Sequence, residues 1–204
     1  MNAIVGLGNP GSEYEGTRHN VGRLAVQRMA GRWKIEMKKK GCSSLAGEGA
    51  WRGRRVGLAL PETFMNASGE AVECLAKRWR LGPAAILVVL DDVSLPLGAV
   101  RIRGQGTSGG HLGLESVLQV LGTQEVPRLR IGVGPGSGKD LTPFVLGRFT
   151  QKEGAALAQG LEEAMEACEI WMEHGVSVAM NRFNRKISAD PVLKDRDRRY
   201  GGGK

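Results

Sequence analysis

The sequence is poor in cysteine, histidine and aromatic side chains. Its 204 residues include three cysteines, three histidines and 5% aromatic residues. Cys42, Cys74 and Cys168 are far apart, odd in number and without a CxxC spacing, so we expect free thiols rather than a zinc or redox motif. We do not expect a catalytic cysteine.

Long apolar runs and export features are also missing. No apolar stretch approaches the roughly 20 residues that a membrane helix needs. The first residues, MNAIVGLGNPG, lack the charged segment and cleavage pattern of a signal peptide. We therefore expect a cytoplasmic protein without membrane contact. The length suits one domain with a sizeable core, placed at residues 1–186, followed by a basic, flexible tail at 187–204.

Positive charge is what the chain has in excess, and it is unevenly placed. The net charge is +8; residues 32–55 hold eight Lys or Arg against two acidic residues, and residues 182–204 hold eight against three. Two basic zones favour a polyanionic partner, and nucleic acid rather than membrane, because no amphipathic lipid-facing helix accompanies them. Solubility is the alternative explanation.

Apolar spacing predicts alternating strands and helices, and hence an α/β domain. Strands are expected at 2–7, 43–50, 55–60, 85–90, 97–103 and 128–133, and helices at 20–33, 68–79, 114–121 and 151–173. Ser68 is a candidate N-cap of the second helix.

The loop after the first predicted strand concentrates polar groups. Residues 4–20, IVGLGNPGSEYEGTRHN, place Asn9, Tyr14 and His19 within a short stretch. Histidine titrates near neutrality and loops carry functional groups, so His19 is a candidate base, with a helix cap as the alternative. The same stretch matches GxGxxG, but a turn rather than a helix follows, so a dinucleotide site is a weak alternative.

Two further strand ends carry candidate residues. Phe64, Met65 and Asn66 lie between a predicted strand and helix, where an open α/β sheet places its binding residues. A hydrophobic staple is the alternative for Phe64 and Met65. Asp91 ends the buried strand at 85–90, where a carboxylate could orient a histidine or cap a helix.

The later strands present arginines and a glycine loop. Arg101 and Arg103 share one face of a strand, as do Arg128 and Arg130. The loop GQGTSGGH, which ends at His111, could hold an anion through its backbone amides, although it lacks the P-loop pattern.

Taken in order, the motifs GLGNPG, TRHN, TFMN, a strand ending in Asp91, SGGH and RLRIGVG span residues 3–184. This series closely resembles the bacterial-type peptidyl-tRNA hydrolases. The resemblance implies one α/β domain with a mixed, largely parallel sheet between helices, acting as a monomer without cofactor or metal. It also implies cleavage of the ester that joins a peptide to the 3′ ribose of tRNA, which recycles tRNA.

The resemblance further implies roles for individual residues. His19 would be the general base for water, Asp91 would orient it, and Asn9 would distinguish a blocked peptidyl amine from a free one. Substrate contacts would come from the TFMN and GGH motifs, from Tyr14 and from basic strand residues: Tyr14, Phe64, Met65, Asn66, His111, Arg101, Arg103 and Arg130. The implied partner is the acceptor arm and 3′ end of peptidyl-tRNA.

One position departs from the family pattern. The usual GGHNG is GGHLG here, with Leu112 in place of an asparagine that binds the peptide. Because His19, Asp91, Asn9 and Asn66 are all present, we expect activity to survive. Two rival hypotheses remain: a hydrolase-like scaffold that binds RNA without turnover, which Leu112 favours, and a nucleotide-dependent oxidoreductase, which rests on the glycine match.

Overall fold

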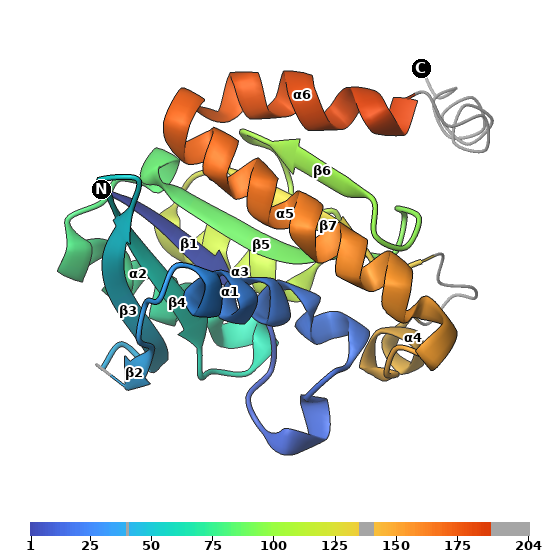
Figure 1. The fold of residues 1–204 in the computed structure, drawn as a ribbon. Helices are drawn as coiled ribbons and strands as arrows, with labels where there is room; N and C mark the ends of the chain where they lie inside the picture. Colours follow the sequence, from blue (N-terminus) through green and yellow to red (C-terminus); the bar gives the residue numbers. More distant parts are fainter. Residues whose placement is uncertain (40, 135–140, 189–204) are drawn as a thin grey trace, which may run out of the picture.

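A computed structural model describes residues 1–39, 41–134 and 141–188. It contains a seven-stranded sheet with the order β2-β3-β4-β1-β5-β7-β6 (Figure 1). The strands are β1 (Asn2–Gly6), β2 (Lys38–Lys39), β3 (Ser44–Trp51), β4 (Arg54–Pro61), β5 (Ile86–Asp92), β6 (Val100–Arg103) and β7 (Arg128–Gly132). The helices are α1 (Val21–Arg32), α2 (Ser68–Trp79), α3 (Leu112–Leu121), α4 (Thr142–Leu146), α5 (Gly154–His174) and α6 (Val176–Ser188).

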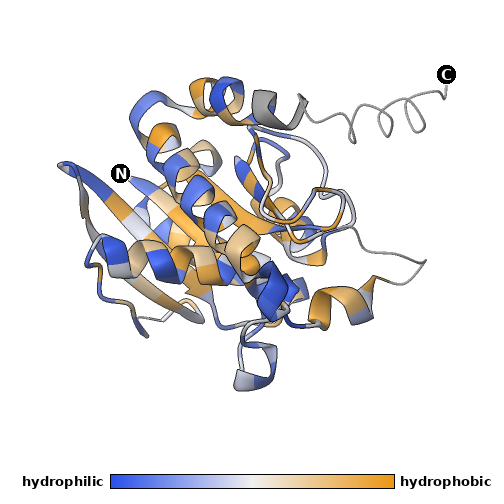
Figure 2. Ribbon diagram, turned by 45° about the vertical axis from the view of Figure 1, so that its right-hand side comes forward, coloured by the Kyte–Doolittle hydropathy of each residue, from blue (hydrophilic) through white to orange (hydrophobic). Residues whose placement is uncertain are grey.

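Helices cover both faces of the sheet, giving three layers. One core cluster packs α1, α5 and α6 against the sheet, and a second packs α2 and α3 against the other face. Figure 2 shows the apolar residues on the strands and on the inner sides of the helices. The strand β5 is buried along its whole length because both its faces are covered, which explains its continuous apolar sequence.

The four central strands determine where a site can form. β4, β1, β5 and β7 are parallel to one another, whereas β2, β3 and β6 join through antiparallel pairs. The predicted mixed, largely parallel sheet is therefore confirmed. The carboxyl ends of the four parallel strands meet at one edge of the sheet, and the loops that follow them lie there together.

At the β6 edge of the sheet, a side chain pairs with backbone groups of the strand. The Asn184 amide on α6 donates to the carbonyl of Ile102 and accepts from its N–H, both at 2.9 Å. Asn184 thus satisfies β6 backbone groups that another strand would otherwise pair.

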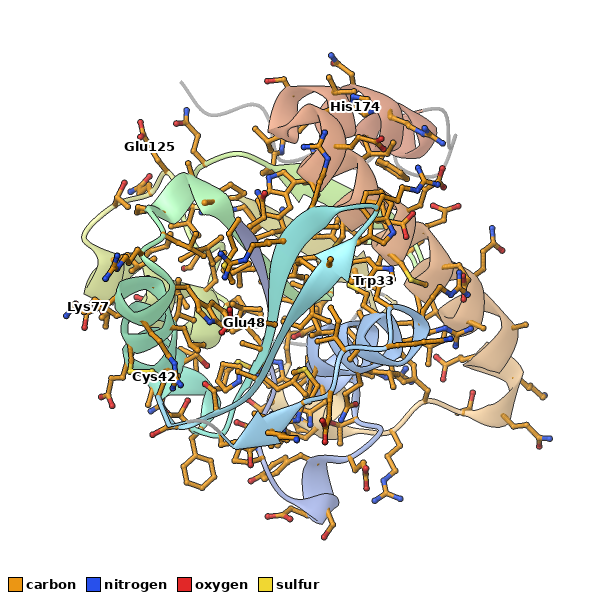
Figure 3. The ribbon with its side chains drawn as sticks, turned by 60° about the vertical axis from the view of Figure 1, so that its left-hand side comes forward. Trp33, Cys42, Glu48, Lys77, Glu125 and His174 are labelled. Atoms are coloured by element: carbon orange, nitrogen blue, oxygen red, sulfur yellow. A yellow bond between two sulfur atoms is a disulfide. The ribbon has the colours of Figure 1, made fainter. Side chains whose placement is uncertain are left out.

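The cysteine prediction is wrong for two of the three residues. Cys42 and Cys74 form a disulfide that joins the segment before β3 to α2, and Figure 3 shows Cys42 beside that helix. Cys168 is free, as predicted, and it is buried. The pairing could not be read from the sequence, because 32 residues separate the two cysteines and only the antiparallel return of β3 along β4 brings them together.

Other local predictions also need correction. Ser68 is the first residue of α2 rather than its cap, and its hydroxyl donates to the Met65 carbonyl. The strand expected at 97–103 begins only at Val100, because Gly98 turns the chain with a φ of 80°. The predicted tail begins in the last turn of α6, and its residues 189–204 lie outside the described part of the chain.

Within the described ranges, no helix combines the length and apolar character needed to span a membrane.

Candidate active site

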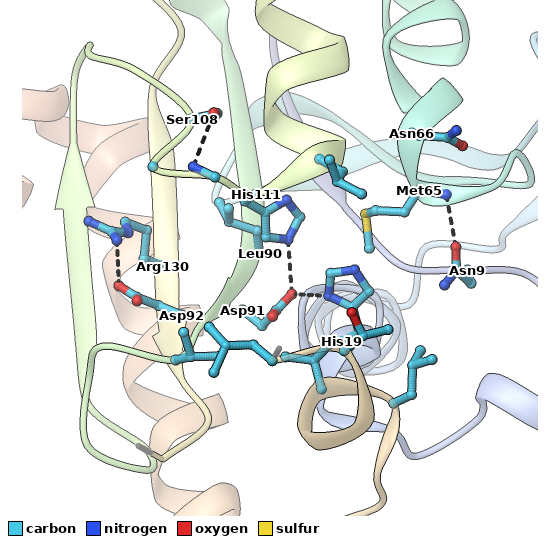
Figure 4. A pocket seen from close by; sticks show the side chains of 18 of the residues that line it. Asn9, His19, Met65, Asn66, Leu90, Asp91, Asp92, Ser108, His111 and Arg130 are labelled. Atoms are coloured by element: carbon cyan, nitrogen blue, oxygen red, sulfur yellow. Dashed lines mark hydrogen bonds and ion pairs between the residues drawn. The ribbon is translucent and has the colours of Figure 1, made fainter. Parts of the chain in front are cut away.

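A cleft of about 400 Å³ opens at the carboxyl edge of the parallel strands (Figure 4). It gathers nine of the eleven predicted site residues: Asn9, Tyr14, His19, Phe64, Met65, Asn66, Asp91, His111 and Arg130. Arg101 and Arg103 are not among its lining residues.

The cleft brings together an imidazole and a carboxylate from distant parts of the chain. His19 lies in a short 3-10 helix, Arg18–Asn20, directly before α1, and its Nδ1 is 2.8 Å from Oδ1 of Asp91 at the end of β5. Gly22 makes the approach possible, since a Cβ there would lie 2.2 Å from the Val89 carbonyl oxygen. Only glycine lets the start of α1, and His19 with it, pack this closely on β5.

A second imidazole contacts the same carboxylate oxygen. His111 Nε2 lies 2.9 Å from Asp91 Oδ1, while its Nδ1 accepts a hydrogen bond from the Leu114 N–H at 3.2 Å. A nitrogen that accepts carries no proton, so the His111 proton belongs on Nε2 and points at Asp91. The sequence suggested a substrate contact for His111, and the structure adds this bond to Asp91.

Asp91 is held as a carboxylate. Burial raises the pKa of the Asp91 carboxyl, but the charges and hydrogen bonds of His111 and His19 outweigh burial and lower it from 3.8 to about 2. An ionised Asp91 accepts the Nδ1 proton of His19 and leaves the lone pair of His19 on Nε2. That tautomer is the one a general base requires.

Asn9 is fixed by three hydrogen bonds at the other end of the cleft. Its side-chain oxygen accepts from the Met65 N–H at 2.8 Å, and its backbone N–H and carbonyl pair with the Asn20 amide at 2.8 and 2.9 Å. Because the Met65 bond occupies the oxygen, the Asn9 Nδ2 group remains as a donor in the cleft. The side chain is preorganised to donate rather than to accept.

His19, Asp91 and His111 also form a cluster of metal-ligand type, which the sequence did not suggest. One ligand atom from each of His19, Asp91 and His111 lies within 4.8 Å of the others. Asp91 Oδ1 lies 2.8 Å from His19 Nδ1 and 2.9 Å from His111 Nε2. Ligands around zinc lie about 3.3 Å apart, so the separations match shared protons better than a shared ion.

The arginines of β7 separate into two kinds. Arg130 pairs with Asp92 at 2.8 Å at the edge of the cleft. Arg128 is buried, and its guanidinium donates to the Val126, Gly106 and Gln124 carbonyls, among others, so it holds the glycine loop in place. Burial and the charge of Arg130 lower the pKa of Arg128 to about 10.

β6 extends the basic face. Arg101 lies opposite Arg130 and Arg103 opposite Arg128 in the antiparallel register. Opposite residues share a face of the sheet, so the predicted common orientation is correct, although these two side chains lie beyond the cleft lining.

The TFMN residues differ in exposure. Met65 is buried between α3 and β1, whereas Phe64 is 63% exposed and Asn66 is exposed at the cleft. The alternative that Phe64 forms a hydrophobic staple with the following helix is therefore wrong, because its ring is exposed.

Two of the three glycines of the GxGxxG match, Gly6 and Gly8, have a packing explanation. A Cβ on Gly6 would lie 2.4 Å from the Gly22 carbonyl oxygen, and one on Gly8 would lie 2.8 Å from the Asn20 side-chain oxygen. These contacts let the loop lie on α1 and require no dinucleotide.

One wall of the cleft was missed by sequence reasoning. Leu141, Thr142, Val145 and Leu146, in or next to α4, line it. This helix has five residues, which is too short to give a readable apolar period.

Comparisons with known proteins agree with the geometry. The family model described as peptidyl-tRNA hydrolase matches residues 3–190. A peptidyl-tRNA hydrolase of Alkaliphilus oremlandii is 44% identical over 90% of this chain and 100% of its own. A Synechococcus relative of the same name is 45% identical over 96% and 88%. The crystal structure of the Acinetobacter baumannii peptidyl-tRNA hydrolase is similar with a TM-score of 0.85, 34% identity and coverage of 90% and 94%.

Proposed function

The chain belongs to the peptidyl-tRNA hydrolase family, and from this premise we propose how its residues act. It hydrolyses the ester bond between the peptide and the 3′ ribose of peptidyl-tRNA, and so returns tRNA for use. The observation that carries the mechanism is the His19 to Asp91 hydrogen bond of 2.8 Å inside an open cleft.

His19 is the general base. Its Nε2 takes a proton from water while the oxygen of that water attacks the ester carbonyl carbon. The bond from that carbon to the ribose O3′ then breaks, and the proton on His19 passes to O3′. Asp91 keeps the imidazole in the required tautomer and stabilises its charged form, as a carboxylate next to a catalytic histidine does.

Asn9 supplies a donor for the developing oxyanion. Its Nδ2 group is oriented before substrate arrives, because the Met65 N–H fixes the other end of the amide. A preoriented donor stabilises the transition state without reorganisation. Asn66, exposed at the same cleft, supplies a second amide for the substrate.

The tRNA lies along the basic side of the cleft. Arg130 lines it, and Arg101 and Arg103 continue the same face of the sheet on β6. We assign the phosphates of the acceptor arm to these arginines, and the 3′ terminal nucleotide to the exposed ring of Phe64 and to Tyr14. The enzyme acts as a monomer in the cytoplasm, where its substrate arises.

Replacing the base tests this proposal. His19→Ala should lower the single-turnover rate on N-acetyl-aminoacyl-tRNA by at least ~10²-fold, while the Kd for tRNA stays within a few fold of wild type. His174→Ala is the matched control, since His174 ends α5 and is not among the cleft residues. A large loss of tRNA affinity in His19→Ala would mark a structural role instead.

The same assay separates enzyme from binder. If wild type binds tRNA but releases no peptide in a single turnover, the alternative of an RNA-binding scaffold is correct.

A further inference from the structure

Large apolar side chains are exposed around the cleft. Among the described residues, six large hydrophobic side chains are exposed, and three of them line this one cleft: Phe64 at 63%, Leu112 at 58% and Leu146 at 39%. Single exposed hydrophobic residues are ordinary on protein surfaces, but a cluster around one concavity marks a binding site. Val145 and Leu141 add partly buried apolar surface to the same wall.

Leu112 is held next to the reacting groups by both of its neighbours. His111 before it bonds to Asp91 at 2.9 Å. Gly113 after it packs on Met65, so closely that a Cβ would lie 2.3 Å from the Met65 sulfur. The Leu112 side chain therefore projects from the first turn of α3 at a fixed distance from the His19 and Asp91 pair.

An aliphatic wall does not suit the RNA part of the substrate. Phosphates require cations or N–H donors, which the Arg130 side of the cleft offers, and bases stack on aromatic rings such as Phe64. Leu112, Val145 and Leu146 have neither charge nor a π-face. They gain free energy only by removing an apolar group from water.

We propose that Leu112 and the α4 wall form a subsite for the side chain of the esterified amino acid, and that this subsite favours apolar residues. The proposal rests on the function above, since the subsite is defined relative to the ester next to His19.

Leucine and asparagine provide a matched test, because the two side chains have nearly the same shape and differ in polarity. One tRNA transcript, charged by an acylating ribozyme with N-acetyl-leucine or N-acetyl-asparagine, keeps the RNA identical. Wild type should show a kcat/KM about 10-fold higher for the leucyl ester, within the range that apolar pockets achieve. Leu112→Asn should reduce this ratio to within about 3-fold of equality, with the asparaginyl ester gaining and the leucyl ester losing.

Val120→Thr is the control, because Val120 is also exposed on α3 but does not line the cleft. It should leave the ratio at its wild-type value, and thermal melts should show both variants folded.

The failures can be told apart. Equal kcat/KM for the two esters in wild type, or an unchanged ratio in Leu112→Asn, would overturn the apolar subsite and leave the hydrolase function intact. Hydrolysis of neither ester by wild type would instead overturn the proposed function.

Discussion

At the scale of single residues, Asp91 is the group that joins the two imidazoles of the cleft. Two imidazoles donate to one of its oxygens, and they hold its pKa at about 2 against the effect of burial. Because this folded-state pKa lies below the usual 3.8, ionised Asp91 contributes stability that is complete above about pH 4 and is lost as the pH falls toward 2. The carboxylate therefore does not titrate in the neutral range where the enzyme is assayed.

Removing the Asp91 charge should affect catalysis more than binding. Asp91→Asn keeps the size of the side chain but no longer enforces the His19 tautomer, so we expect kcat to fall by ~10² to 10⁴-fold with KM within a few fold. The measurement is a steady-state pH profile. In wild type, protonation of Asp91 should not contribute to the acid limb, since Asp91 stays ionised down to about pH 3. A wild-type acid limb that disappears in Asp91→Asn would contradict this assignment.

The sequence predicted which residues gather at the cleft better than the bonds between them. His19 and Asp91 could be proposed because one follows and one ends a readable strand. The bond between His111 and Asp91 could not be predicted, because it depends on the Leu114 N–H fixing a tautomer. The burial of Arg128 was equally hidden, since alternation gives a strand residue its face but not the loop that covers that face.

At the scale of elements, Arg18 joins the segment that carries His19 to α4. Its guanidinium lies 4.7 Å from the Phe144 ring centroid and 4.8 Å from that of Phe149, and it pairs with Glu153 at 3.0 Å. Its backbone N–H donates to the Gly147 carbonyl. The wall formed by α4 is therefore held in position relative to His19 through one buried side chain, that of Arg18.

Arg18→Ala should loosen that wall. We expect kcat/KM to fall by roughly 10 to 100-fold, because small displacements of positioning groups are costly, together with a lower Tm. Arg18→Lys keeps the charge but loses the planar stacking. Its kcat/KM and Tm should therefore lie between those of wild type and Arg18→Ala. Arg28→Ala is the control: Arg28 also pairs with a glutamate, Glu162 of α5, but at the exposed surface. Wild-type kinetics in Arg18→Ala would show that α4 is held by other contacts.

Elements were predictable where their apolar period was long. The helix at 68–79 coincides with α2, and the helices at 20–33, 114–121 and 151–173 correspond to α1, α3 and α5, with differences of a few residues at their ends. α4 and α6 were missed for different reasons. α4 is too short for a period. α6 lies mostly before the predicted tail at 187–204, and the sequence analysis assigned no helix to it, although Phe183 and Ala179 on its inner face are buried.

At the scale of the whole molecule, the net charge of +8 predicts salt-dependent binding of tRNA. Arg101→Ala with Arg103→Ala should weaken binding and reduce the slope of log K against log salt by about 0.7 to 0.9 per lost phosphate contact. The control pair is Arg54→Ala with Arg55→Ala. These two residues begin β4, at the end of the strand that lies away from the cleft. An unchanged slope in the first pair would exclude β6 from the phosphate path.

When it is formed, the Cys42–Cys74 disulfide contributes to the global stability. The disulfide closes a loop across 32 residues and ties the start of β3 to α2, the helix that follows the TFMN loop. A loop of that length constrains the unfolded chain by about 3 to 4 kcal/mol. For a chain of this size, that corresponds to a change in Tm of roughly 10 °C.

Reduction should therefore lower the Tm of wild type by roughly 10 °C and have no effect on the double variant Cys42→Ser with Cys74→Ser. Thiol titration gives an independent count. The denatured, unreduced protein should show one reactive thiol, Cys168, and three after reduction. The native protein should react slowly, because burial raises the pKa of the Cys168 thiol. Three thiols before reduction, with a Tm that does not respond to the reductant, would mean that Cys42 and Cys74 stay reduced and that packing alone holds β3 against α2.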